Sequence, residues 1–90
     1  MDTREITEEL VALLEQSGVE IRREAMGGGG GGLCVIKEKK IFFVDTDCAL
    51  AEMNAICSRA VNELLDIESI YIRPQVRQYI EKYTDTASYP

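Results

Sequence analysis

Apolar residues recur every three or four positions in three segments of the chain, a spacing that predicts three amphipathic helices. The segments cover residues 3–17, residues 50–65 and the stretch that follows Pro74. Asp2 and Glu5 stand three positions apart, as in an N-terminal capping box, and they mark the start of the first helix. The second segment carries an apolar stripe of about four turns, so we expect it to be the main core element.

The pattern between the first two predicted helices is that of β-strands. Residues 19–24 alternate between apolar and charged side chains, which predicts a half-buried strand. Residues 33–36 and 41–44 are apolar throughout, and the charged residues 37–40 between them predict a hairpin with a four-residue turn. Residues 67–72 predict a further short strand.

Together these elements predict one α+β domain over residues 1–83, followed by a flexible tail at residues 84–90. The expected domain has three helices and a small, mostly antiparallel sheet of three or four strands, in the order α-β-β-β-α-β-α. The glycine-rich residues 27–32 are expected to form a mobile loop within it.

The two strands of the predicted hairpin are apolar on both faces, a pattern typical of strands that are covered on two sides. A chain of 90 residues builds only a modest core, so we expect another protein or a second copy of the chain to supply part of that cover. A homodimer is the simplest form. The residues expected at this contact are Leu33, Ile41, Phe42 and Phe43.

The charge of the chain limits its partners. The formal net charge is −6 and the isoelectric point is near 4.6, which oppose binding to nucleic acid or to an anionic membrane. The acidic start of the chain resembles neither a secretory signal nor a transit peptide, and no apolar run approaches the ~20 residues that span a bilayer. These features predict a cytoplasmic protein without nucleic-acid or membrane partners.

Six consecutive glycines precede the hairpin, and two interpretations account for them. A mobile linker is the first, and we favour it because glycine loses the most backbone entropy on ordering. In the second, the bare backbone closes as a flap over a small anion or nucleotide, supported by Asp45 or Asp47. The glycines of this candidate site are Gly27, Gly28, Gly29, Gly30, Gly31 and Gly32.

The segment from Ile41 to Asp47 resembles the opening motif of the haloacid-dehalogenase-like phosphatases, in which an apolar strand delivers two aspartates. Cys48 stands where the commonest form of that motif has glycine, and the chain is too short for the rest of such an enzyme. We therefore interpret Asp45, Thr46 and Asp47 as N-capping residues of the next helix.

The remaining candidate chemistry is sparse. The chain has no histidine, and its cysteines, Cys34, Cys48 and Cys57, form no C-x-x-C pair and lie among apolar neighbours. We expect them to pack as small hydrophobic residues. No catalytic residue, metal site or cofactor is predicted.

Much of the chain resembles a family of small uncharacterised bacterial proteins. The resemblance implies a cytosolic bacterial origin and no known activity. The stretches that carry it are Gly18-Val19-Glu20-Ile21-Arg22, Leu33-Cys34 after the glycines, Phe43-Val44-Asp45, Ala51-Glu52 and Ile72-Arg73-Pro74-Gln75-Val76-Arg77.

The order of helix, strand, glycine-bearing loop, hairpin and helix is also similar to the N-terminal half of the zinc metallopeptidases that cleave phage repressors and stress regulators. In those enzymes the helix after the hairpin carries H-E-x-x-H, two zinc ligands and a general base. Here residues 51–58 read AEMNAICS, without a ligand pair. The resemblance implies a non-catalytic relative that has kept a peptide-binding strand edge.

Overall fold

A computed structural model of the chain describes the backbone of residues 1–88 and the side chains of residues 1–83. It contains three helices and three strands over these residues, which confirms the predicted α+β fold. In chain order they are α1 (Thr3–Gln16), β1 (Glu20–Glu24), β2 (Gly31–Ile36), β3 (Lys39–Asp45), α2 (Leu50–Leu64) and α3 (Pro74–Ser88).

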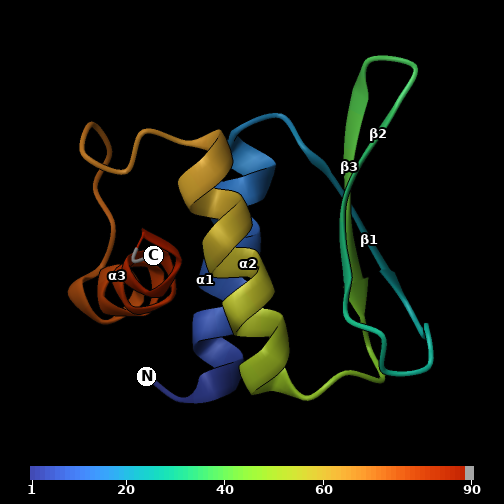
Figure 1. Cartoon of the computed structure of the whole chain (residues 1–90), viewed down its shortest axis with the longest axis horizontal. Coiled ribbons are helices and arrows are strands. Elements are labelled where there is room, and N and C mark those ends of the chain that lie inside the picture. The colour runs from blue at the N-terminus through green and yellow to red at the C-terminus, as the bar shows by residue number, and fades with distance from the viewer. Residues whose placement is uncertain (89–90) are drawn as a thin grey trace.

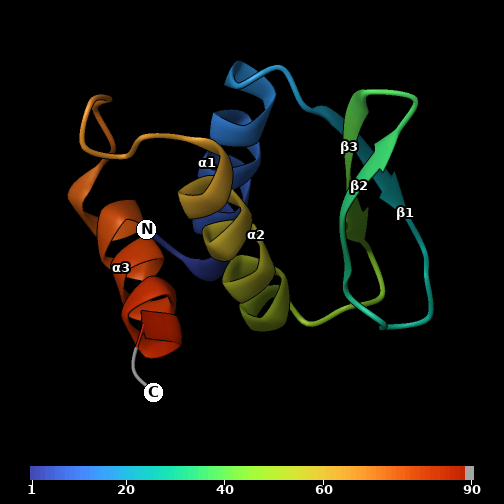
Figure 2. The same ribbon diagram turned by 45° about the horizontal axis from the view of Figure 1, so that its top comes forward.

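The elements form three layers (Figure 1). Helices α1 and α2 make the middle layer, the sheet lies on one side of it and α3 on the other. Helix α1 contacts β1, and α2 contacts β2. Figure 2, a view turned by 45°, shows the same arrangement, with helices on only one side of the sheet.

The sheet has the order β1-β3-β2. Strands β2 and β3 form the predicted antiparallel hairpin, with Ile36 paired to Lys39. Strand β1 pairs with the other side of β3 and runs parallel to it, so the sheet is mixed rather than mostly antiparallel. Strand β3 is the central strand, and it has the most buried side chains. A central strand has neighbours on both edges, and these neighbours help to cover its side chains.

The predicted fourth strand at residues 67–72 is wrong. This segment has no strand pairing and connects α2 to α3 through turns, so the order is α-β-β-β-α-α. Its apolar residues pack from the side of α3, across the helical layer from the sheet: Ile72 is buried, and Ile67 and Ile70 pack against the core. Burial rather than strand pairing therefore explains its apolar pattern.

The core lies on both sides of the α1–α2 layer. Phe42 from β3 fills the sheet side and Ile80 from α3 fills the other, and neither side chain is exposed to solvent. A buried hydrogen bond from the Thr7 hydroxyl to the Asn54 side chain joins α1 to α2 between them. Asp2 and Glu5 form the predicted capping box of α1.

The C-terminal helix extends further than expected. Helix α3 begins at Pro74, as predicted, and its backbone continues through Ser88. Residues 84–88 of the predicted tail are thus helical, whereas residues 89–90 lie outside the described residues. The flexibility of this tail stays a prediction.

The hairpin turn is tighter than the predicted four residues. Only Lys37 and Glu38 separate β2 from β3, and both have positive φ, of 51° and 68°. A two-residue hairpin turn of type I′ needs this left-handed backbone at both positions and favours Asn-Gly, because Cβ comes close to the following carbonyl oxygen there, glycine has no Cβ, and asparagine tolerates this conformation. The turn is therefore a strained point of the fold.

We expect the double substitution Lys37→Asn and Glu38→Gly to stabilise the protein by about 1 kcal/mol and to raise Tm by roughly 4–8 °C, because it relieves this strain. Thermal unfolding followed by circular dichroism measures the shift. Lys40→Asn is the control, since it removes a neighbouring charge from β3 and leaves the turn unchanged. An equal rise in Tm in the control would attribute the effect to charge.

Candidate functional site

Asp45 lies at the end of β3 beneath the glycine loop, and its side chain is only 1% exposed. Its carboxylate accepts hydrogen bonds from three backbone amides: those of Met26 at 3.0 Å, Gly30 at 3.0 Å and Asp47 at 2.9 Å. Charge-assisted bonds of this kind are stronger than neutral ones. Asp45 therefore fixes the path of the loop over the end of the sheet.

Asp47 adds a second bond to the same loop, because its carboxylate accepts from the Gly27 amide at 3.0 Å. The predicted capping role of Asp45, Thr46 and Asp47 is wrong. The N-cap of α2 is Ala49, and no side chain caps that helix. The two carboxylates face the loop amides instead.

These contacts change the ionisation of Asp45. The Gly30 amide is the main cause that holds the pKa of the carboxyl below its ordinary value, and the amides of Met26 and Asp47 act in the same direction. Desolvation by burial opposes them in part. Asp45 is consequently an anion at neutral pH, and it accepts hydrogen bonds from loop amides that would otherwise lack acceptors.

The glycines are required by the shape of the loop. Five of the six have positive φ, and Gly29 is the exception. A Cβ at Gly31 would lie 2.3 Å from the carbonyl oxygen of Phe43, and one at Gly30 would lie 2.8 Å from Cδ1 of Ile56. Glycines at these positions therefore allow the loop backbone to pass close to its neighbours, which a mobile linker would not require.

The outer face of the sheet, away from the helices, is the second part of the site. Side chains alternate along β3, so Phe42 and Val44 join the core while Ile41 and Phe43 lie on the other face, where Ile41 is only 4% exposed and Phe43 is half-buried. Phe42 is not exposed at all, which removes it from the predicted contact residues. Leu33 is half-buried and packs against the core from β2.

The two halves of this outer face differ in polarity. On the β1 side, Glu20 forms ion pairs with Arg22 at 2.6 Å and with Lys39 at 2.7 Å. Hydrogen bonds from Lys39 and Arg22 lower the pKa of Glu20 to about 2. On the β2 side, the exposed residues Cys34 and Ile36 lie beside β3, and neither carries a charge. The apolar part of the face therefore continues to the edge formed by β2.

Two of the cysteines are buried, as expected, and Cys34 is exposed. The Cys48 thiol donates to the Glu52 carboxylate at 3.2 Å, and this contact raises its pKa. Burial raises the pKa of Cys57 to about 12. A nucleophilic cysteine needs a lowered pKa, so neither of the buried thiols is suited to catalysis.

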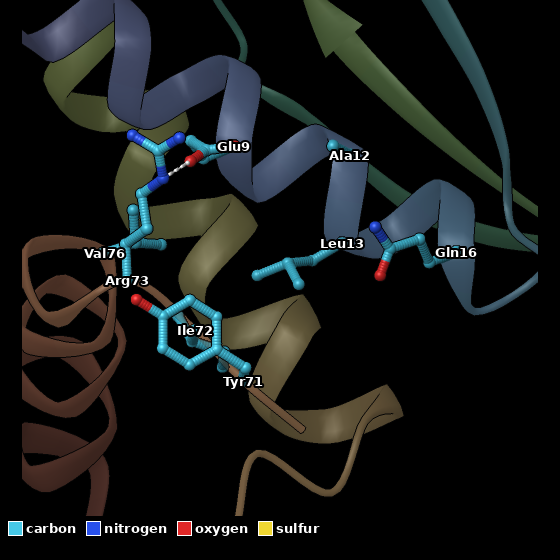
Figure 3. Close-up of a pocket in the computed structure, with 8 residues that line it drawn as sticks. All are labelled: Glu9, Ala12, Leu13, Gln16, Tyr71, Ile72, Arg73 and Val76. Atoms are coloured by element: carbon cyan, nitrogen blue, oxygen red, sulfur yellow. Dashed lines mark ion pairs between the residues drawn. The ribbon is translucent and has the colours of Figure 1, made fainter.

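A groove of about 220 Å³ lies on the helical side of the molecule, between α1 and the start of α3 (Figure 3). Leu13 and Ile72 contribute apolar surface, and Arg73 pairs with Glu9 at 2.8 Å. The cation of the groove is already paired with Glu9, and the lining holds no histidine or cysteine.

Within residues 1–83 no group of three metal-ligating side chains comes together. None of the described helices has the length and apolar character needed to cross a bilayer. A search for relatives found no matching family model, no matching curated protein and no matching solved structure. The resemblances noted from the sequence therefore stay predictions, and function is argued from the geometry alone.

The glycine loop can be tested with a matched pair of substitutions. We expect Gly31→Ala to lower the free energy of unfolding by roughly 3 kcal/mol, because positive φ and the Phe43 carbonyl both oppose a Cβ. Gly29→Ala has neither obstacle and should change it by less than about 1 kcal/mol. Urea unfolding measures both. Equal effects would show that the loop does not hold this shape in solution.

Asp45→Asn replaces an acceptor of three amides by a group that also presents a donor to them. We expect it to lower Tm at pH 7 by roughly 5–10 °C. Because the folded pKa is lowered, this stabilisation is complete above the ordinary pKa of 3.8 and is lost as the pH falls through the folded pKa. The variant should therefore lose less stability than the wild type below about pH 4.

Asp47→Asn is the control for this charge, because Asp47 is exposed and makes one bond to the loop. It should lower Tm by less than about 3 °C. Thermal unfolding from pH 2 to pH 7 gives both profiles. A smaller effect at Asp45 than at Asp47 would contradict the role given to Asp45.

Proposed function

We propose that this protein is a self-association module that makes its contact through the uncovered side of the sheet. The observation that carries the proposal is the one-sided cover of the sheet: α1 and α2 pack on one face, and no described element covers the other. The half-buried Phe43 and the exposed Cys34 and Ile36 form an apolar area on that face, over the buried Ile41. Exposed apolar area of this kind is typical of interaction surfaces.

The distribution of charge supports contact through the sheet rather than through the helices. Residues 19–47, which hold the sheet, contain five cationic and five anionic side chains, so their net charge is zero. The whole net charge of −6 therefore belongs to residues 1–18 and 48–90, which form the helices and the segments that flank them. Two copies that approach through their helical layers repel each other, whereas the sheets meet without net repulsion.

Anion binding by the glycine loop is less well supported. The amides of Met26, Gly27 and Gly30 already donate to carboxylates of the chain itself. An external anion would have to displace Asp45 or Asp47 and would meet their negative charge. The arrangement gives the loop a structural role at the end of the sheet.

The relation to zinc metallopeptidases gains no support from the geometry, since α2 carries no pair of metal ligands one turn apart. A cytoplasmic location and a bacterial origin stay predictions from the sequence. Self-association needs neither of them.

Phe43→Glu tests the proposed contact surface. Phe43 points outward and is half-buried, so the substitution should leave the core intact. The added charge should raise the dissociation constant of the dimer at least tenfold, measured by native mass spectrometry across a dilution series. Gln78→Glu adds the same charge on α3 and should leave the constant within about twofold. A dimer that tolerates Phe43→Glu, or a wild-type monomer, would refute the proposal.

A further inference from the structure

We propose that a second copy of this chain pairs with the free edge of β2 in antiparallel fashion, placing each Cys34 opposite the other. This inference rests on the proposed self-association and places its contact at the β2 edge and the adjoining strip of the outer face, where Ile36 of one copy lies next to Phe43 of the other. The result would be a continuous six-stranded sheet, with both helical layers on the same side. Four features of β2 lead to it.

The first feature is that β2 is an unprotected edge. Strands β1 and β2 both lie at the margin of the sheet, but β1 reads EIRRE whereas β2 reads GGLCVI. Charged residues on an edge strand discourage pairing with another chain, and their absence permits it. Strand β2 also contains no proline, so every residue keeps its backbone donor.

The second feature is the direction of the backbone groups. In the two-residue hairpin, Ile36 and Lys39 close the turn and exchange hydrogen bonds. Antiparallel ladders alternate, so Cys34 also bonds toward β3, while the N–H and C=O groups of Leu33 and Val35 point to the free edge. An added antiparallel strand meets two residues with unpaired donors and acceptors.

The third feature is the register that these groups allow. We take both helical layers to lie on one side of the combined sheet, so each residue pairs with a residue that faces the same side. The two-fold axis then lies at one residue, which pairs with its own copy, rather than midway between two residues. With Cys34 on the axis, Leu33 pairs with Val35 of the second copy, and four hydrogen bonds form. An axis at Leu33 would instead involve Gly31, whose φ of 70° departs from a regular strand.

This register also explains two exposed apolar side chains. Val35 is 62% exposed and Ile36 is 52% exposed, which is unusual for adjacent large apolar residues on a strand. In the paired sheet, Val35 lies beside Leu33 of the second copy. Ile36 lies beside Gly32 of the second copy, where the missing side chain leaves room next to Phe43.

The fourth feature is charge complementarity between the two ends of the hairpin. The tip, residues 37–40, has three lysines and one glutamate, of which Lys39 is paired with Glu20, whereas the exposed Asp47 stands at the opposite end. Antiparallel pairing places the cationic tip of one copy beside the anionic end of the other. Parallel pairing would place like charges together, so the charges select the antiparallel orientation.

Cys34 provides the first test, because it is exposed while Cys48 and Cys57 are buried. Mild oxidation with diamide should convert most of the wild-type dimer to a Cys34–Cys34 disulfide, because opposite residues in an antiparallel pair lie within disulfide range. Cys34→Ser should abolish the product. If the protein forms a dimer but oxidation produces no Cys34–Cys34 disulfide, the register is wrong. Two sheets packed face to face would give this result, because they lie ~10 Å apart.

Amide hydrogen exchange provides the second test, and it needs no substitution. Exchange at Leu33 and Val35 should slow at least tenfold as the protein is concentrated across the dimer transition, because these amides become bonded only in the dimer. The amide of Cys34 is bonded within the hairpin and should change less. Unchanged exchange at Leu33 and Val35 in the dimer would exclude pairing at the edge.

Val35→Pro is the matching variant, because it removes a donor that points to the free edge. The dissociation constant should rise at least tenfold, since two symmetry-related hydrogen bonds are lost. Val35→Thr keeps the donor and should stay within about threefold. Circular dichroism checks that both variants fold, and the exchange experiment decides the question if Val35→Pro does not.

The outcomes separate this inference from the proposed function. Sensitivity to Phe43→Glu without sensitivity to Val35→Pro, and with fast exchange at Leu33, would leave a self-associating module that docks face to face and would refute edge pairing. A wild-type monomer at ~100 μM would refute both, since that concentration exceeds the micromolar dissociation constants of weak specific complexes.

Discussion

The arrangement of the sheet depends on the hydrogen bonds that the Asp45 carboxylate accepts from the glycine loop. Strand β1 ends at Glu24, directly beside Asp45, and the chain must then cross the end of β3 to begin β2 on its other edge. A backbone that crosses a strand end at close range loses water from its amides, and each unsatisfied amide is costly. Asp45 supplies the acceptors, and the glycines permit the close approach.

This crossing determines which strand is exposed. Because the loop carries the chain over β3, the hairpin returns with β3 in the centre and β2 at the margin. The parallel pairing of β1 with β3 has the same origin, since β2 takes up the reversal of direction between them. The glycine loop and the free edge of β2 are therefore two consequences of one connection.

The sequence predicted the elements that depend on local patterns. The helical stripes, the capping box of Asp2 and Glu5 and the hairpin follow from spacing, and the structure confirms them. The sequence suggested Asp45 or Asp47 as a support for the glycine loop only if the loop closed over an anion. Their direct bonds to the loop amides were not predicted, because a carboxylate before a helix is also the usual signal of an N-cap. The actual partners of Asp45, the amides of Met26 and Gly30, lie 19 and 15 residues earlier, and no local pattern encodes a contact over that distance.

Three other features were ambiguous for related reasons. Consecutive phenylalanines must point to opposite faces of a strand, yet only the helices that cover one face decide that Phe42 is the buried one. The apolar run at residues 67–72 fits a strand, but α1 and α2 separate it from the sheet. The positive φ of five glycines likewise depends on where the loop must pass, which the composition of the loop does not reveal.

The placement of charge in the helical layer agrees with an interface at β2 rather than at β1. Helix α1, which contacts β1, carries four glutamates and one arginine, whereas α2, which contacts β2, carries two glutamates and one arginine. Pairing at the β1 edge would bring two copies of the more acidic helix together. Pairing at β2 brings the less charged helix to the symmetry axis and leaves α1 at the outer margins, where repulsion is screened by distance and salt.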